Sequence, residues 1–304
     1  MDVNYFGLTD MPFRLTPDNH YFYPSREHRR ALSHLLFGLS QGEGIIVITG
    51  EVGAGKTTLV EHLSVRLVST NYSISKIPAP QGRPGDLLKL VASGFRSDYQ
   101  DTPGSILLKL VDTLRRQREL GRRSLLIVDE AQSIPFSGLE ELRLLSNLSE
   151  NGRALLQIIL LGQPQFRTAI DGGDLDQLRQ RILASYHINA LTRDDVQPYI
   201  EHRLRTAGWT SRPRFTAESF MTIYRFTEGL PRRLNRLCAR ILLHAALEEA
   251  EDITPSMVEL VAQELDDDLS VRLLKAQPQN VSLTNSIGVP SPQGYADFAE
   301  PSSS

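Results

Sequence analysis

The stretch Ile45-Ile-Val-Ile-Thr-Gly-Glu-Val-Gly-Ala-Gly-Lys-Thr-Thr58 decides the fold of this chain. Its β-branched start predicts a buried strand, which ends at Gly50 in a loop of small residues before a helix that begins near Lys56. The spacing of Gly50 and Gly55-Lys56-Thr57 matches the phosphate-loop pattern called Walker A. A chance glycine-rich turn is the alternative, but the strand before the loop and the helix after it favour a site for nucleotide phosphates.

Each part of this loop has a physical role. Glycines let backbone N–H groups close around phosphate oxygens, and Lys56 neutralises charge on the β and γ phosphates. The hydroxyl of Thr57 can ligate Mg²⁺. ATP and Mg²⁺ are therefore the expected cofactors. The expected nucleotide-binding residues share this loop and the start of its helix: Gly50, Glu51, Val52, Gly53, Ala54, Gly55, Lys56, Thr57 and Thr58.

A second strand carries acidic groups. Residues 124–132 read Ser-Leu-Leu-Ile-Val-Asp-Glu-Ala-Gln, so an apolar run ends in Asp129 and Glu130. This is the form of a Walker B strand, in which Asp129 would hold Mg²⁺ and Glu130 would orient and polarise the attacking water. An acidic pair at a strand end can also be a solvated loop start. Its distance after the phosphate loop favours the catalytic interpretation.

The next buried strand ends in an amide. Residues 155–161 predict that strand, and Gly162-Gln163-Pro164 follows it. Gln163 would project from the strand end close to the γ-phosphate, where it could sense whether that phosphate is present. The alternative is a turn residue before a helix that begins at Pro164. We expect Gln163 among the catalytic residues, with Lys56 and Glu130.

Three arginines are candidates for contacting phosphate from outside the sheet. Residues 175–183 predict a short helix with Arg179 and Arg181, which do not share a face. At most one of them would reach a neighbouring subunit's nucleotide, and we favour Arg181; a solvated surface charge is the alternative. Arg232 lies in the first turn of a helix after Gly229-Leu-Pro. There it could contact the γ-phosphate and so couple the state of the nucleotide to the angle between the nucleotide-binding domain and the domain that carries Arg232.

The order of elements predicts two folded domains. Strands alternate with helices through residues 1–190, which indicates a parallel sheet with helices on both faces. Residues 191–268 are expected to form a small all-helical lid, and residues 269–304, rich in Ser, Pro, Gln and Asn, to be disordered. Aromatic residues and prolines fill the first 24 positions without a helical period. That segment either packs over a core or covers the adenine base, and both interpretations stay open.

Composition sets the class of protein. The 304 residues are 40% hydrophobic and 23% charged, as in an ordinary globular protein of about two domains. The net charge of -3 means that nucleic-acid binding would need a local basic patch. Cys238 is the only cysteine, which excludes an internal disulfide. No stretch resembles a membrane span or a signal peptide, so we expect a cytoplasmic protein that could attach to the membrane through a partner.

These motifs together resemble the AAA+ ATPases of the ExeA or general-secretion A type. The resemblance covers about residues 4–265 and rests on short signatures in the right order. It is closest to a subgroup encoded with exosortase and exopolysaccharide loci, through Ala184-Ser-Tyr-His187, Tyr199-Ile-Glu-His-Arg-Leu-Arg205 and Gly208-Trp209. The signatures are Walker A, Asp129-Glu130-Ala-Gln132, Gly162-Gln163-Pro164, Leu178-Arg-Gln-Arg181, Gly229-Leu-Pro-Arg232, and the opening Tyr5-Phe-Gly-Leu-Thr-Asp-Met-Pro-Phe13 with Pro17-Asp18.

The resemblance implies an AAA+ fold and a cytoplasmic ATPase that assembles with itself, for example as a hexamer. Such an ATPase drives or organises export or polysaccharide machinery at the bacterial inner membrane. The resemblance also implies that Arg181 is a finger acting on a neighbour and Arg232 a sensor acting in its own subunit. Larger relatives add a membrane span and a peptidoglycan-binding domain, which we do not expect here. A nucleic-acid-binding regulator of the transposition type, and a nucleotide-dependent scaffold without turnover, are the alternatives.

Overall fold

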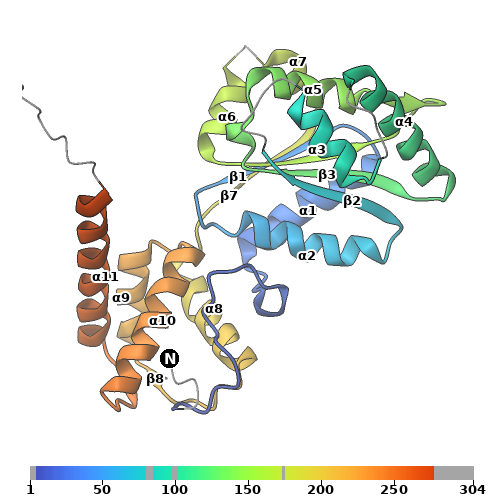
Figure 1. Cartoon of the computed structure of the whole chain (residues 1–304). Helices are drawn as coiled ribbons and strands as arrows, with labels where there is room; N and C mark the ends of the chain where they lie inside the picture. The colour runs from blue at the N-terminus through green and yellow to red at the C-terminus, as the bar shows by residue number, and fades with distance from the viewer. Residues whose placement is uncertain (1–4, 80–84, 98–101, 173–174, 277–304) are drawn as a thin grey trace, which may run out of the picture. The chain divides into compact units, whose positions relative to one another are not determined.

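The computed structural model describes residues 5–79, 85–97, 102–172 and 175–276, the last with side chains only to Asp267. The chain divides into a compact unit, Met1–Leu265, and a second unit, Asp266–Ser304 (Figure 1). All the residues of the predicted nucleotide site belong to the first unit.

A parallel sheet forms the centre of the first part of the chain. Its five strands follow the order β2-β3-β6-β1-β7, and each neighbouring pair is parallel. Because parallel strands place their carboxyl ends at one edge, the ends of β1, β3 and β6 come together there. The strands are β1 (Ile45–Gly50), β2 (Tyr72–Pro78), β3 (Arg123–Asp129), β6 (Gln157–Gly162) and β7 (Ile182–Ile188).

Helices cover both faces of this sheet, as the sequence predicts. Alternate strand residues face opposite sides, so Ile46 and Ile48 pack with one helical layer, and Ile45 and Val47 with the other. The first layer is α1 (Arg26–Gln41) and α2 (Lys56–Val68) (Figure 1). The second layer is α3 (Asp86–Gly94), α4 (Pro103–Glu119), α5 (Phe136–Ser146), α6 (Pro164–Asp171) and α7 (Asp176–Arg179) (Figure 1).

The remaining elements build a separate helical core. This part is not all-helical, because two short strands pair in parallel across it. The antiparallel hairpin of β4 (Ser149–Glu150) and β5 (Arg153–Ala154) lies elsewhere, in the connection from α5 to β6. The helical part consists of α8 (Arg193–Thr206), β8 (Arg214–Phe215), α9 (Ala217–Thr227), α10 (Pro231–Leu247), β9 (Asp252–Ile253) and α11 (Pro255–Ala276).

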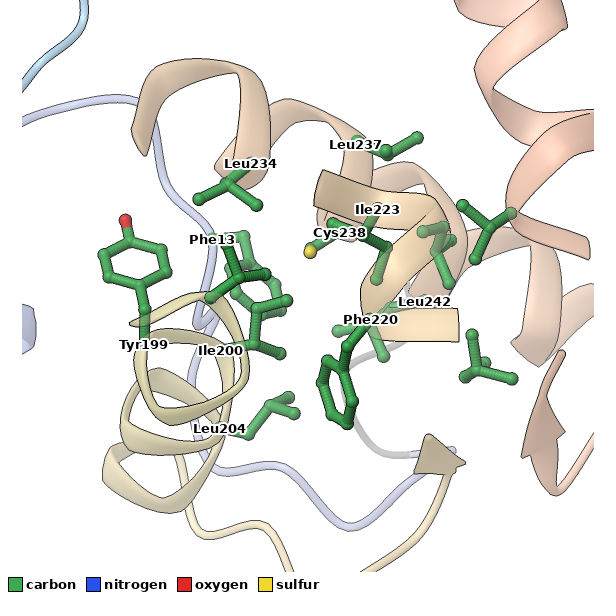
Figure 2. Close-up of a cluster of buried hydrophobic side chains, with 14 of the residues drawn as sticks. Phe13, Tyr199, Ile200, Leu204, Phe220, Ile223, Leu234, Leu237, Cys238 and Leu242 are labelled. Carbon is green, nitrogen blue, oxygen red and sulfur yellow. The ribbon is translucent and has the colours of Figure 1, made fainter. Parts of the chain in front are cut away.

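Most buried side chains of the N-terminal segment pack with the helical core, whereas Phe22 packs with the layer of α1 and α2 on the sheet. Phe6, Leu8, Phe13 and Tyr21 belong to the buried cluster of helices α8 to α11. In Figure 2, Phe13 lies between α8, which carries Tyr199 and Ile200, and Leu234 of α10. The expected boundaries, which gave residues 1–190 to the nucleotide-binding domain, therefore differ from the packing at this end. Hydrophobic contacts between residues almost 200 positions apart determine which domain these residues join, and a local sequence pattern cannot predict such contacts.

Two helices also differ from the expected ranges. The helix predicted over 175–183 ends at Arg179, and Ile182 starts β7 because it pairs with Ile45 of β1. Arg181 therefore lies in a turn, not on a helix. The last helix of the expected lid runs past residue 268 to Ala276, so residues 269–276 are not the start of a disordered tail. Their sequence is rich in Leu with Arg, Lys and Ala, all good helix formers. Residues 277–304 lie outside the described part.

Candidate functional site

The phosphate loop connects β1 to α2 through a backbone that only glycine adopts easily. Gly53 and Gly55 have φ values of 86° and 93°, in the left-handed region. Gly55 caps α2, so the free N–H groups of the first turn point at the loop. The ammonium of Lys56 donates to the carbonyl oxygens of Gly50 at 2.7 Å and Glu51 at 3.0 Å. Burial lowers the pKa of Lys56, and the carboxylates of Glu130, Asp129 and Glu51 oppose that shift.

The two predicted metal ligands meet across the sheet edge. The hydroxyl of Thr57 on α2 donates to Oδ2 of Asp129 at the end of β3, at 2.9 Å. Among the described residues no cluster of three or more His, Cys, Asp or Glu could hold a metal. A hydroxyl and one carboxylate fit Mg²⁺, which usually takes one or two protein oxygens and fills its shell with water and phosphate. The residues present therefore suit the expected ion.

Glu130 is held by two side-chain amides. Its Oε2 accepts from Nε2 of Gln163 at 3.1 Å and from Nε2 of Gln132. Oε1 of Gln132 accepts from the backbone N–H of Gln163 at 2.9 Å, which closes the triangle. Burial raises the pKa of Glu130, but these hydrogen bonds and the charges of Lys56 and Arg232 outweigh it and leave the pKa below its usual value. Glu130 is thus a carboxylate at neutral pH.

Arg232 joins this group from the helical part of the chain. Its backbone N–H donates to the carbonyl oxygen of Gly53 at 3.2 Å. A Cβ on Gly53 would lie 2.5 Å from Cβ of Arg232, so the close approach requires glycine in the loop. Arg232, Lys56, Thr57 and Glu130 line one pocket. Its position therefore agrees with the expected phosphate contact.

The N-terminal segment closes the other side of the same pocket. Its lining includes Thr16, Pro17, Tyr21, Phe22 and Tyr23 beside the phosphate loop. The two interpretations of this segment are thus compatible, because Phe6 and Phe13 pack in the helical core while residues 14–18 and 21–23 line the pocket. An apolar wall with backbone carbonyls is the usual environment of an adenine base.

Three further residues contribute to this site, and the sequence motifs gave them no role. Gln132 was only part of a motif. His28 is buried, and its Nε2 lies 2.6 Å from where a Cβ of Gly55 would be. Arg203 is buried against the N-terminal segment. The cap Ser25-x-x-His28 was a usable signal, whereas nothing local indicates the partners of Arg203.

The ring of His28 is held by Ser25 beside the phosphate loop. The hydroxyl of Ser25 accepts from the backbone N–H of His28 at 3.2 Å and lies 2.7 Å from Nδ1. Nε2 is the nitrogen that faces the phosphate loop. Burial lowers the pKa of His28 to about 4, although a hydrogen bond with the backbone of Ala54 opposes the shift. A neutral imidazole therefore supports the loop.

The two candidate finger arginines lie at the other edge of the sheet. The carbonyl oxygen of Arg181 accepts from the N–H of Ile45, at the amino end of β1, whereas the phosphate loop follows its carboxyl end. Arg181 thus cannot serve the nucleotide of its own subunit. Arg179 pairs with Asp176 at 2.8 Å. Within the described residues the exposed Arg181 has no such carboxylate, so it is the more available cation.

Comparison with known families and proteins supports the AAA type. Residues 39–170 match the family model of the AAA domain. The chain is 38% identical over 267 residues to the general secretion pathway protein A of Aeromonas hydrophila. That match covers 87% of this chain but 48% of the relative, so the chain spans about half the length of the protein it matches. In the described part of the chain, no helix is long and apolar enough to cross a membrane.

Solved structures share the fold at low identity. Cdc6p from Pyrobaculum aerophilum has a TM-score of 0.65 at 17% identity, over 87% of this chain and 71% of that chain. The ORC1 protein of Aeropyrum pernix in complex with DNA has a TM-score of 0.63 at 17% identity, covering 88% and 72%. The RuvB Holliday junction branch migration motor of Thermotoga maritima has a TM-score of 0.56 at 15% identity, covering 84% and 74%. The predicted fold, an AAA-type P-loop domain with a helix-covered parallel sheet, is confirmed.

Proposed function

We propose that this chain binds Mg²⁺ and ATP and hydrolyses ATP to ADP and phosphate. The observation that carries the proposal is the pair of amides on Glu130, next to Thr57, Asp129 and Lys56. When bound, the metal and nucleotide supply the phosphoryl group to be transferred and the charge that neutralises it. Lys56 is positioned to bind the phosphates, and Thr57 and Asp129 to hold the metal. Glu130, a carboxylate, orients and polarises the attacking water.

We infer that Gln163 and Arg232 report the state of the nucleotide. Gln163 follows β6 directly and donates to Glu130, so a phosphate that competes for the amide of Gln163 would free the carboxylate. Arg232 contacts the phosphate loop from α10 and so connects the helical part to the pocket. The division at residues 190–191 into a nucleotide-binding part and a lid is proposed on this contact, with residues 5–21 completing the lid core.

We further propose that the site is completed in an oligomer such as a hexamer. Arg181 is exposed and lies at the sheet edge away from its own phosphate loop, as a residue acting on a neighbour must. Likeness to a general secretion pathway protein supports a role in driving or regulating export machinery. The signatures shared with exosortase-associated ATPases favour polysaccharide export, with the protein cytoplasmic and held at the inner membrane by a partner.

Steady-state ATP hydrolysis at low salt tests the first proposal, with Glu130→Gln as the blank. Turnover per subunit should rise with protein concentration as the oligomer assembles. Arg181→Ala should remove that rise, and Arg179→Ala, the matched control two positions away, should keep it. A rate per subunit that is independent of concentration, or equal in wild type and Arg181→Ala, would refute the shared site.

The alternative of a nucleic-acid-binding regulator is tested in the same assay. The structural neighbours include a protein in complex with DNA, but its identity to this chain is only 17%. Strong stimulation of turnover by double-stranded DNA, lost as salt rises, would favour the regulator. ATP turnover that DNA does not change would leave the export ATPase as the better proposal.

A further inference from the structure

A second pocket lies at the opposite edge of the sheet from the phosphate loop. It is bounded by the end of α1, by the turn from α4 into β3, and by the hairpin of β4 and β5 with the start of β6. Ser124, near the start of β3, and Gln157, the first residue of β6, are among its lining residues. None of the residues assigned to the nucleotide lines it.

The charges around this pocket are of one sign. Its lining holds four arginines (Arg118, Arg122, Arg123 and Arg153) and one acid, Glu43, a balance of four positive against one negative. Arg122, Arg123 and Arg153 are exposed, and none of the three forms an ion pair with the acids of the described residues. Like charges that one acid only partly offsets repel one another, and an anion between them would relieve that repulsion.

One of these arginines is held in place by the backbone. Nη1 of Arg118 donates to the carbonyl oxygens of Glu150 at 3.0 Å and Arg153 at 3.2 Å. Arg115, one turn earlier on α4, pairs with Glu150 at 2.9 Å and so fixes the same hairpin. The guanidinium of Arg118 is thus oriented before any ligand arrives, which lowers the entropic cost of binding.

Two lining residues each carry a buried polar atom that has no partner within the protein. Ser124 is 4% exposed and Gln157 is 3% exposed, yet Oγ of Ser124 and Oε1 of Gln157 make no hydrogen bond. Nε2 of Gln157 donates to the carbonyl oxygens of Gly38 at 3.3 Å and Glu43 at 3.2 Å, so its oxygen is the free end. Both atoms are closed off from the open space of the pocket, so bound water beneath the arginines, rather than a ligand in the pocket, is the partner that would satisfy them.

We propose that this pocket is a binding site for a phosphate ester. The arginines supply bidentate donors for the phosphate oxygens, and Arg118 is already oriented by the hairpin. Soluble phosphate esters and lipid headgroups share this chemistry. The site is separate from the phosphate loop, so it does not depend on ATP hydrolysis.

Calorimetric titration of the protein saturated with Mg²⁺ and ADP tests this site, with glycerol 3-phosphate as the soluble probe. Wild type should bind one equivalent, and Arg122→Glu and Arg153→Glu should each weaken the affinity by about tenfold or more. Ser124→Ala keeps every charge and should leave the affinity within about twofold, because the hydroxyl is buried away from the ligand. Arg116→Glu is the control, because Arg116 is exposed on α4, the helix of Arg118, but does not line the pocket. It should leave the affinity within about twofold.

Sedimentation with vesicles of phosphatidylglycerol and phosphatidylcholine in equal parts shows whether the phosphate ester is a lipid headgroup or a soluble molecule. Capture that is lost in Arg122→Glu and kept in Arg116→Glu assigns a lipid headgroup, whereas binding of the soluble probe without capture assigns a free ester. The proposal is overturned if neither probe binds, or if Arg116→Glu weakens binding as much as Arg122→Glu, since a diffuse basic field would then suffice. Unchanged ADP affinity at the phosphate loop shows that each variant is folded and keeps this test independent of the proposed ATPase.

Discussion

The side-chain amide of Gln163, at the end of β6, donates to the carboxylate of Glu130, at the end of β3, over 3.1 Å. The strands β3 and β6 are neighbours in the sheet, although 33 positions separate the two residues. The predicted water-activating acid and the predicted phosphate sensor are therefore one hydrogen-bonded unit. Whatever displaces one of them acts on the other.

Gln163→Ala is expected to lower kcat by about 10- to 100-fold with little change in KM, because the lost contact orients Glu130 rather than the bound nucleotide. Removing one hydrogen-bond donor also raises the pKa of Glu130. The acid limb of the pH–activity profile should therefore shift to higher pH than in wild type. Gln165→Ala, exposed on α6, is the control. A variant whose KM rises while kcat stays constant would show that Gln163 only binds nucleotide.

Gly53→Ala is expected to weaken ATP binding by separating Arg232 from the phosphate loop. The new Cβ would lie 2.5 Å from Cβ of Arg232, and φ of 86° adds strain. Gly85→Ala is a matched control, because Gly85 has φ of 89° and open space around it. We expect both variants to lose about 1 kcal/mol of stability from the strained backbone. Only Gly53→Ala should also raise the nucleotide Kd, by about tenfold. Equal nucleotide affinity in the two variants would contradict the contact.

His28 should make stability depend on pH below neutrality. Its pKa is depressed from 6.5 to about 4 by burial, so the folded state favours the neutral ring. This contribution is complete above pH 6.5 and is lost as the pH falls toward 4, and its full size is about 3 kcal/mol. We expect the free energy of unfolding in urea to be higher for wild type than for His28→Gln at pH 7.5, and this difference to become smaller by pH 5. His20→Gln, on the exposed part of the N-terminal segment, controls for loss of an imidazole. A difference in unfolding free energy that is the same at both pH values would show that a neutral His28 is not its cause.

Arg203→Met should release the N-terminal segment. Nε of Arg203 donates to the carbonyl oxygen of Pro12 at 2.6 Å, and Nη1 to that of Tyr21 at 3.4 Å. Its guanidinium also lies 5.0 Å from the ring centre of Tyr21. The variant leaves two carbonyl groups unpaired, at a cost of about 1–3 kcal/mol each if they stay buried. We expect faster proteolysis within residues 5–21 and weaker nucleotide binding, both measured against Arg205→Met, whose side chain is exposed. Proteolysis at the wild-type rate would show that Arg203 does not hold the segment.

Much of the nucleotide site could be predicted because its residues lie in short, continuous motifs. A phosphate loop needs its glycines, Lys56 and Thr57 in sequence, since one turn must wrap one phosphate group. Asp129, Glu130 and Gln163 each follow a buried strand, and parallel strands bring their carboxyl ends to one edge. Their convergence therefore followed from the predicted sheet, and the distances of 2.9 Å and 3.1 Å agree with it.

The sequence by itself determined that β1, β3 and β6 are buried strands and which residues follow them at the sheet edge, because these depend on local periodicity and on motifs. The tertiary structure alone decided that Phe6 and Phe13 complete the helical core, that Ile182 leaves its helix for β7, and that Arg203 is buried. It alone brought Arg118 and Arg153 together with Ser124 and Gln157. Each of these depends on contacts between segments distant in the chain, where burial and strand pairing outweigh the local preferences that sequence patterns record.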